Sequence, residues 1–351
     1  MIDKFRNIFA IPELRQRIFF TLSLLVVVRI GAHIPVPGIN TEALGAAVQN
    51  FQNTLFGLYD LFAGGAFQKA TIFALGIMPY ISASIILQLM GVVVPYFQRL
   101  QKEGDEGRKK ITQITRYGTV LIASLQAYSI AIFLENLTST VGGFQMTVVP
   151  EPGLSFRLLT MITLVTGVIF IMWLGEQITE RGIGNGISLI IMIGIVSRLP
   201  NVIVSEVSLI QEEVRGPLTE VVLLGIMFII VAFVVLLTQG TRKIPVQYAK
   251  RIVGRKVYGG QSTHIPLRVN TAGVMPIIFA QSIMFLPNTI AMFFQGSEFM
   301  QGIMRVFSPQ HWFYWTVFGL TIIFFTYFYT AIAFNPQEVA ENMRKSGGFI
   351  P

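Results

Sequence analysis

The chain has 351 residues, of which 53% are hydrophobic and only 13% carry a charge. Water-soluble domains carry about 25% charged residues, because water must solvate their surface. Composition therefore predicts an integral membrane protein whose surface is largely covered by lipid. The sequence contains no cysteine, which excludes disulfides, thiol catalysis and cysteine-ligated metal centres.

The first seventeen residues are basic and lead directly into an apolar run. A secretory signal peptide begins in the same way, but a cleavage site of small residues would have to follow its apolar run. Here the run is followed by the sequence Ile-Pro-Val-Pro-Gly at 34–38. We therefore expect this first apolar run to remain in the protein as an uncleaved membrane span.

Eight long apolar segments follow one another along the chain. Each is about long enough to cross a hydrocarbon core of about 30 Å at about 1.5 Å per residue. Because lipid offers the backbone no hydrogen-bond partners, each segment is expected to be a helix. The fifth is the weakest, since three glycines interrupt it. The segments are 18–36, 71–95, 118–137, 157–175, 184–200, 217–238, 272–294 and 311–334.

Positive charge predicts the orientation of these spans. Most of the 26 Lys and Arg residues lie in alternate connections, and the other connections hold few. Under the positive-inside rule, this places both termini of the chain in the cytoplasm. A net charge of +8 could also indicate nucleic-acid binding, but a membrane topology signal is the commoner cause. The basic segments are 1–17, 97–117, 176–183, 239–268 and 335–351.

A short sequence occurs twice in the chain. Residues 76–83 and 273–280 share Gly, Met, Pro, Ile and Ala at matching positions. By the charge distribution, the first copy lies in an inward-running span and the second in an outward-running one. Copies with opposite directions indicate an inverted repeat, with functional helices at the interface of the two halves. Proline in both copies is expected to loosen the helix at that point.

Six motifs in a fixed order resemble the SecY family, the channel-forming subunits of bacterial-type protein translocases. The longest is WLGEQITERGIGNGIS at residues 173–188. The resemblance covers the whole chain. The other motifs lie at 29–39, 73–85, 102–108, 261–267 and 333–336.

The resemblance implies an all-α integral membrane fold, a polytopic helical bundle of two inverted-repeat halves at 1–200 and 201–351. Family members have ten spans, so eight of ten are expected here, with an incomplete C-terminal half. The loop 239–268 and the partial tail 335–351 would be cytoplasmic. The implied function is a channel in the cytoplasmic membrane that moves unfolded secretory polypeptides across it and releases membrane segments laterally into the lipid.

The resemblance also implies roles for individual residues. A ring of apolar side chains would form the narrow waist of the pore, and a plug helix would occupy about 55–67. A polar cluster would line a lateral gate between spans 2–3 and 7–8. The waist ring is Ile77, Ile81, Ile187, Ile191 and Ile278. The lateral-gate cluster is Ser82, Gln126 and Asn270. Without the resemblance, an isoleucine in a membrane helix would be assigned to lipid contact or packing.

The loop 239–268 contains basic residues and no acidic one. It could serve membrane topology alone, but about thirty residues is long for a connection between helices. A cationic loop would attract ribosomal RNA through its phosphates, or the acidic patch of a motor ATPase. We expect docking through Arg242, Lys243, Lys250, Arg251, Arg255 and Lys256.

Partners follow from the same resemblance. They are small membrane subunits of the SecE and SecG type, a motor ATPase of the SecA type or a ribosome, signal peptides and nascent polypeptides, and lipid. No cofactor and no metal is expected.

Two other classes of function share some of these features. A secondary solute transporter also uses inverted repeats, but it usually has ionisable groups at the membrane midplane, where these spans have almost none. An intramembrane enzyme is not expected, because the three histidines lie in different segments and the sequence has no HExxH or GxSxG motif.

Two kinds of charged residue near the spans have structural explanations. Arg29 lies toward the outer end of the first span, where snorkelling to the interface would account for it. Glu176 and Glu180 lie beside Arg181 and are expected to form salt bridges rather than an acid–base pair.

Overall fold

The computed structural model is mostly helical. It describes residues 10–48, 60, 63–141, 144–212, 216–248, 251–253, 256–258, 263–293, 302, 305–333, 336–345 and 348–349. The chain forms two compact units. The first consists of 1–203 and 281–317, and the second of 204–280 and 318–351. The predicted division into inverted halves at 1–200 and 201–351 stays a prediction.

Helices occupy all eight apolar segments. Two further helices, α6 and α10, lie largely outside these segments. In chain order the ten helices are α2 (Pro12–Gly31), α5 (Met78–Val93), α6 (Pro95–Lys102), α7 (Asp105–Glu135), α8 (Leu154–Arg181), α9 (Gly186–Val196), α10 (Leu199–Gln211), α11 (Pro217–Gln239), α12 (Met275–Phe293) and α14 (Trp312–Ala333). In the described part of the chain, five helices are long and apolar enough to cross a membrane, or six if α5 and α6 form one span. The predicted membrane helix bundle is confirmed.

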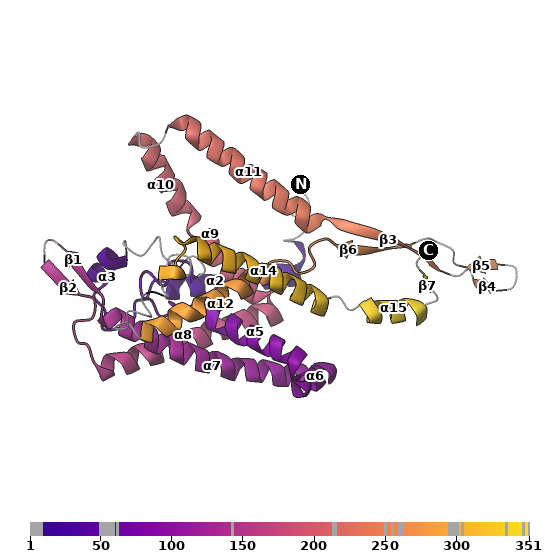
Figure 1. Ribbon diagram of the computed structural model, residues 1–351, viewed down its shortest axis with the longest axis horizontal. Coiled ribbons are helices and arrows are strands. Elements are labelled where there is room, and N and C mark those ends of the chain that lie inside the picture. Colours follow the sequence, from indigo (N-terminus) through magenta and orange to yellow (C-terminus); the bar gives the residue numbers. More distant parts are fainter. Residues whose placement is uncertain are drawn as a thin grey trace. The chain divides into compact units, whose positions relative to one another are not determined.

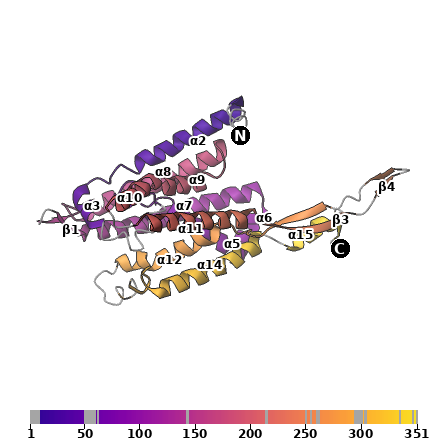
Figure 2. The same cartoon turned by 90° about the horizontal axis from the view of Figure 1, so that it is seen from above.

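In the first unit, the long helices α7 and α8 lie side by side, and α5 packs on α7 (Figure 1). Helix α2 contacts α8 and α9 (Figure 2). At one end of this unit, the short helix α3 (Thr41–Val48) packs on β1 (Thr138–Val141), which pairs with β2 (Phe144–Thr147). The N-terminal spans thus form one packed bundle.

Small residues allow these helices to approach closely. Ala123, Ala127 and Ala131 recur every fourth residue on α7, and each is fully buried. A Cβ added at Gly167 of α8 would lie 2.0 Å from the carbonyl oxygen of Ile72. Such contacts are typical of membrane helices, where van der Waals packing of small residues drives association.

The second span is shorter than the sequence predicted. Residues 64–77 form turns around an isolated bridge between Pro35 and Thr71, and the helix begins only at Met78. Helix α5 ends before Pro95, whose ring removes a backbone N–H. The next helix, α6, continues at a bend of 99°. Periodicity alone could not locate these two breaks inside a continuous apolar run.

The second unit contains strands that the sequence did not predict. In one antiparallel sheet the order is β6 (Thr263–Arg268), β3 (Thr241–Tyr248), β7 (Gly348–Phe349). A separate hairpin pairs β4 (Arg251–Val253) with β5 (Lys256–Tyr258). The tail helix α15 (Pro336–Lys345) contacts β7 (Figure 1). The basic loop is therefore a paired structure that a segment of the tail joins.

Candidate functional site

The two copies of the repeat have the same local structure. Gly76 and Gly273 have φ angles of +55° and +62°, and a helix begins two residues later in each copy. Each helix starts with Met followed by Pro. The sequence predicted that proline loosens a helix interior, which is wrong. In both copies it lies in the first turn, where a missing N–H leaves no hydrogen bond unmade.

Two of the predicted waist residues occupy the same position in this repeat. The N–H of Ile81 donates to the carbonyl oxygen of Ile77 at 3.1 Å, and the N–H of Ile278 donates to that of Val274 at 3.4 Å. Both isoleucines therefore lie in the first turn of their helix, four residues after the equivalent carbonyl. The repeat gives an independent reason to compare them.

The waist residues of the first unit lie near the starts of two helices. Ile77, the residue before α5, and Ile81, in its first turn, are buried, whereas Ile187 and Ile191 on α9 are half-buried. Ile187 lies against α8, because a Cβ added at Gly175 would be 3.2 Å from its Cγ1. A cavity of about 30 Å³ lies beside Ile77, and its other lining residues include Phe73, Ile171, Ile190 and Ile193. Membership of the waist ring stays a prediction.

The lateral-gate residues have different surroundings. Ser82 is half-buried on α5, and Gln126 is buried on α7, the helix against which α5 packs. Among the described residues, the Oε1 atom of Gln126 has no hydrogen-bond partner. Asn270, in the second unit, is exposed, and its Oδ1 accepts the N–H of Gly273 at 2.9 Å. Its local function is to hold the turn before α12, and a gate function stays a prediction.

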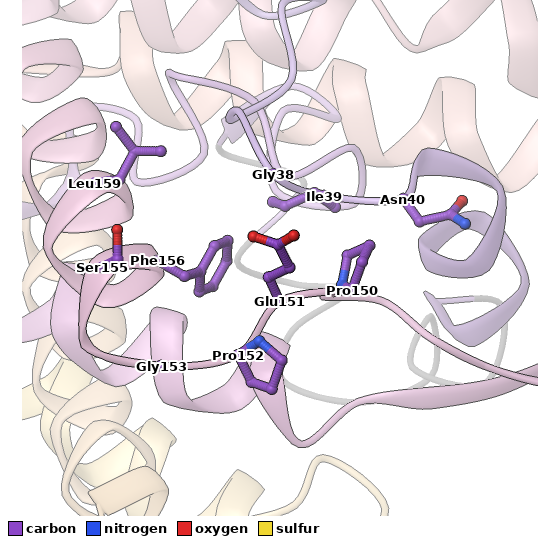
Figure 3. Close-up of a pocket in the computed structure, with 10 residues that line it drawn as sticks. All are labelled: Gly38, Ile39, Asn40, Pro150, Glu151, Pro152, Gly153, Ser155, Phe156 and Leu159. Carbon is purple, nitrogen blue, oxygen red and sulfur yellow. The ribbon is translucent and has the colours of Figure 1, made fainter.

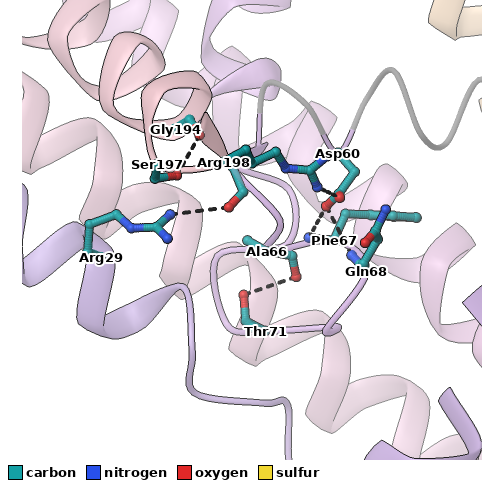
Figure 4. Close-up of polar contacts among 10 residues, drawn as sticks. Arg29, Asp60, Ala66, Phe67, Gln68, Thr71, Gly194, Ser197 and Arg198 are labelled. Atoms are coloured by element: carbon teal, nitrogen blue, oxygen red, sulfur yellow. Dashed lines mark hydrogen bonds and ion pairs between the residues drawn. The ribbon is translucent and has the colours of Figure 1, made fainter. Parts of the chain in front are cut away.

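Most of the predicted plug, 55–67, lies outside the described residues, but Asp60 and residues 63–67 are described. They reveal a polar cluster that the sequence did not predict (Figure 4). The carboxylate of Asp60 is fully buried and forms an ion pair with Arg198. Its Oδ1 accepts the backbone N–H groups of Phe67 at 2.9 Å and Gln68 at 3.0 Å.

Arg29 belongs to the same cluster. Its Nη1 donates to the carbonyl oxygen of Gly64 at 3.2 Å, so snorkelling alone, as the sequence suggested, does not account for this residue (Figure 4). One signal could have revealed the cluster. Asp60 is the only acidic residue between Glu42 and Glu103, in a stretch that is otherwise apolar or neutral apart from a few cations.

A larger pocket of about 660 Å³ opens near the start of α8 (Figure 3). Its lining combines the segment before α3 with residues 150–153, and an exposed carboxylate, Glu151, lies among prolines and the ring of Phe156. Among the described residues, Glu151 is the one ionisable group in its lining. We assign it no function.

The predicted docking residues are only partly described. Arg242 and Lys243 lie exposed on β3, opposite Leu267 and Pro266 of β6. Arg251 lies in β4 and Lys256 in β5. Lys250 and Arg255 lie outside the described residues. Across the described part of the chain, no group of three or more His, Asp or Glu residues could hold a metal ion.

Comparison with known proteins gives consistent results. The family model described as SecY matches residues 71–351. The chain is 45% identical over 352 residues to protein translocase subunit SecY of Aquifex aeolicus (strain VF5), covering 100% of this chain and 81% of that protein. It is 47% identical over 345 residues to protein translocase subunit SecY of Escherichia coli (strain K12), covering 97% of this chain and 76% of that protein.

Two solved structures share the fold. One is a protein-conducting channel, with a TM-score of 0.52 and 18% identity, over 79% of this chain and 58% of that chain. The other comes from a study of the plug domain of SecY, with a TM-score of 0.51 and 17% identity, over 79% of this chain and 57% of that chain. At such low identity, these likenesses establish the fold alone.

Proposed function

Because the chain belongs to the SecY family of protein translocase subunits, which are multi-pass membrane channels and not enzymes, we propose how it conducts its substrates. Unfolded secretory polypeptides would pass through an apolar waist, and membrane segments would leave sideways into lipid. The observation that carries the proposal is the identity of 45% with a protein translocase subunit along 100% of this chain.

The waist would be formed by Ile77, the residue before α5, Ile81 of α5, Ile187 and Ile191 of α9, and Ile278 of α12. The matching helix-start positions of Ile81 and Ile278 support the proposal. Isoleucine suits a passage for many sequences, because it has no hydrogen-bonding group for a moving chain to bind. A narrow apolar ring also excludes ions when no chain is present, since it loses its water.

Lateral release would involve Ser82 and Gln126 on α5 and α7, together with Asn270. The buried Oε1 of Gln126, which has no hydrogen-bond partner within the described part of the chain, supports this role. A buried amide oxygen without a partner is costly unless another state of the protein satisfies it. An apolar signal segment that parts the helices would let water or its own backbone reach this oxygen.

Docking of a ribosome or a motor ATPase of the SecA type would use the exposed cations of β3, Arg242 and Lys243, with the other basic residues of the loop. Both termini of the chain and this loop would lie in the cytoplasm, and small subunits of the SecE and SecG type would complete the complex. The plug domain named for the SecY structure would correspond here to about 55–67.

Reconstitution tests the proposal directly. The assembled translocase, with this chain as its channel subunit, is placed in proteoliposomes with a motor ATPase of the SecA type and ATP. An unfolded secretory precursor should become protected from external protease, and the same precursor without its signal peptide should not. Equal protection of both precursors, or of neither, would contradict the proposed function.

A further inference from the structure

One buried carboxylate, that of Asp60, organises the turn segment 63–77, which precedes α5. Through Oδ1, Asp60 accepts the N–H groups of Phe67 and Gln68, and its own backbone oxygen accepts the N–H of Gly65 at 3.1 Å. Its other carboxylate oxygen pairs with Arg198, from the short connection between α9 and α10 (Figure 4). A single side chain thus closes the segment on itself and ties it to another part of the bundle.

The segment fits closely against α9. A Cβ added at Gly64 would lie 2.8 Å from the Cα of Gly194, so the two backbones are in direct contact. Ala66 is fully buried. Arg29 also binds the segment, through the carbonyl oxygen of Gly64. The segment is therefore held by two guanidinium groups that belong to different helical regions.

The charges of the described residues in this cluster do not balance. Among these residues, two guanidinium groups, of Arg29 and Arg198, accompany one carboxylate, that of Asp60. A buried charge that loses its partner is strongly destabilising, more so than the pair is stabilising. Displacing the segment would separate Asp60 from Arg198 and leave Arg198 without its carboxylate. The ion pair therefore opposes displacement more strongly than an exposed pair would.

The same segment leads directly to the predicted waist. It ends at Ile77, the residue before α5. The small cavity beside Ile77 is lined by Ala63 and Gly76 of the segment and by Arg29. If the segment moved away from α9, the surroundings of Ile77 would therefore change.

We propose that the Asp60–Arg198 ion pair, supported by Arg29, is a latch that keeps the segment 63–77 seated and so holds the channel closed. The statement that the ion pair keeps a channel closed rests on the proposed function. The position of the segment itself can be measured without any transport. Opening would require the pair to separate, and a translocating chain or a docked partner would have to supply that free energy.

The test uses the cysteine-free chain in its assembled translocase. Ala66→Cys introduces a single thiol as a reporter of the segment, and the rate at which maleimide labels this thiol is measured in proteoliposomes. Asp60→Asn keeps an oxygen for the two N–H groups but removes the charge, and Arg198→Gln removes the opposite charge. The control is Glu135→Gln, which breaks the Glu135–Arg157 pair of the same unit.

Each single latch variant should raise the labelling rate of the segment reporter about tenfold or more, because loss of one partner of a buried pair shifts the equilibrium toward the displaced state. The double variant should label no faster than the faster single variant, since both changes remove one interaction. Glu135→Gln should leave the rate unchanged. Unchanged labelling in both single variants, or effects that multiply in the double variant, would overturn the latch.

A second reporter separates displacement from unfolding. Ala127→Cys places a thiol at a fully buried position on α7, and this variant is made in each background without the first reporter. The α7 reporter should stay unlabelled. If it reacts as fast as the segment reporter, the protein is unfolding generally and the proposal is overturned.

Ion leak and precursor transport are then measured. Faster labelling of the segment reporter in a translocase that transports nothing would leave the latch standing and contradict the proposed function instead.

Discussion

Arg116 on α7 binds both carboxylate oxygens of Glu176 on α8. The Nε–Oε1 distance is 3.0 Å, and the Nη2–Oε2 distance is 2.6 Å. The Glu176 side chain is 16% exposed and that of Arg116 is 46% exposed, so water screens the pair in part. The two-point geometry fixes how α7 and α8 lie along each other more than it stabilises the fold.

Glu176→Gln should lower the free energy of unfolding by about 1 kcal/mol, because partly exposed pairs of good geometry contribute about that much. The measurement is unfolding of the purified protein in detergent by denaturant or heat. Glu180→Gln serves as the control, since Glu180 is exposed on the same helix end. An equal loss in both variants would mean that helix-end charge, rather than the Arg116 contact, is responsible.

The sequence predicted the helical bundle well because apolar length and charge alternation are local signals. It also predicted a salt bridge for Glu176, which is confirmed. The partner, however, is Arg116, sixty positions away, rather than the adjacent Arg181. Such pairing depends on how two helices are aligned, and a single sequence does not contain that alignment.

The latch residues were missed for the same reason. Asp60 and Arg198 are far apart in sequence and meet only when the turn segment folds against α9. Strands β3 and β6 were also missed. The apolar and basic residues of 241–268 suggested a cationic loop, but their pairing register depends on residues at opposite ends of it, such as Thr241 and Arg268.

Topology can be tested with single cysteines in this cysteine-free chain. Lys109→Cys and Lys243→Cys, at exposed positions, should react with a membrane-impermeant maleimide only from the cytoplasmic side. Glu151→Cys, exposed in the pocket of Figure 3, should react only from the opposite side. Labelling is compared in intact cells and in inverted vesicles. Reaction of any one site from the wrong side would contradict the proposed orientation.

The exposed cations of strand β3, in the sheet formed by β6, β3 and β7, should serve docking rather than folding. Arg242→Glu with Lys243→Glu should weaken binding of the motor ATPase or ribosome about tenfold, because exposed cations steer acidic partners but contribute little to stability. Binding is measured at physiological salt. Lys109→Glu with Lys110→Glu changes the same charge at another exposed site. Equal weakening by both pairs would show that bulk charge, and not this sheet, determines docking.

The repeat can be tested through its two glycines. Gly76→Ala and Gly273→Ala should each lower the free energy of unfolding by about 1 kcal/mol, because a positive φ strains alanine. Steric clash does not contribute. The nearest atom to an added Cβ at Gly76 lies 3.6 Å away, and at Gly273 none lies within 4 Å. Gly45→Ala, inside α3 with equal space, should instead stabilise the protein.

The last prediction concerns the waist. Ile81→Asn and Ile278→Asn should let the closed channel conduct ions, because a polar side chain holds water in a narrow gap that isoleucine keeps dry. Ion efflux from proteoliposomes is measured beside thermal stability, with Leu164→Ala as the control. Leu164 is 1% exposed within the core of the first unit, so its truncation should cost about 2–5 kcal/mol without any leak. If the asparagine variants behave like Leu164→Ala, losing stability while the membrane stays sealed, then Ile81 and Ile278 are packing residues and the waist lies elsewhere.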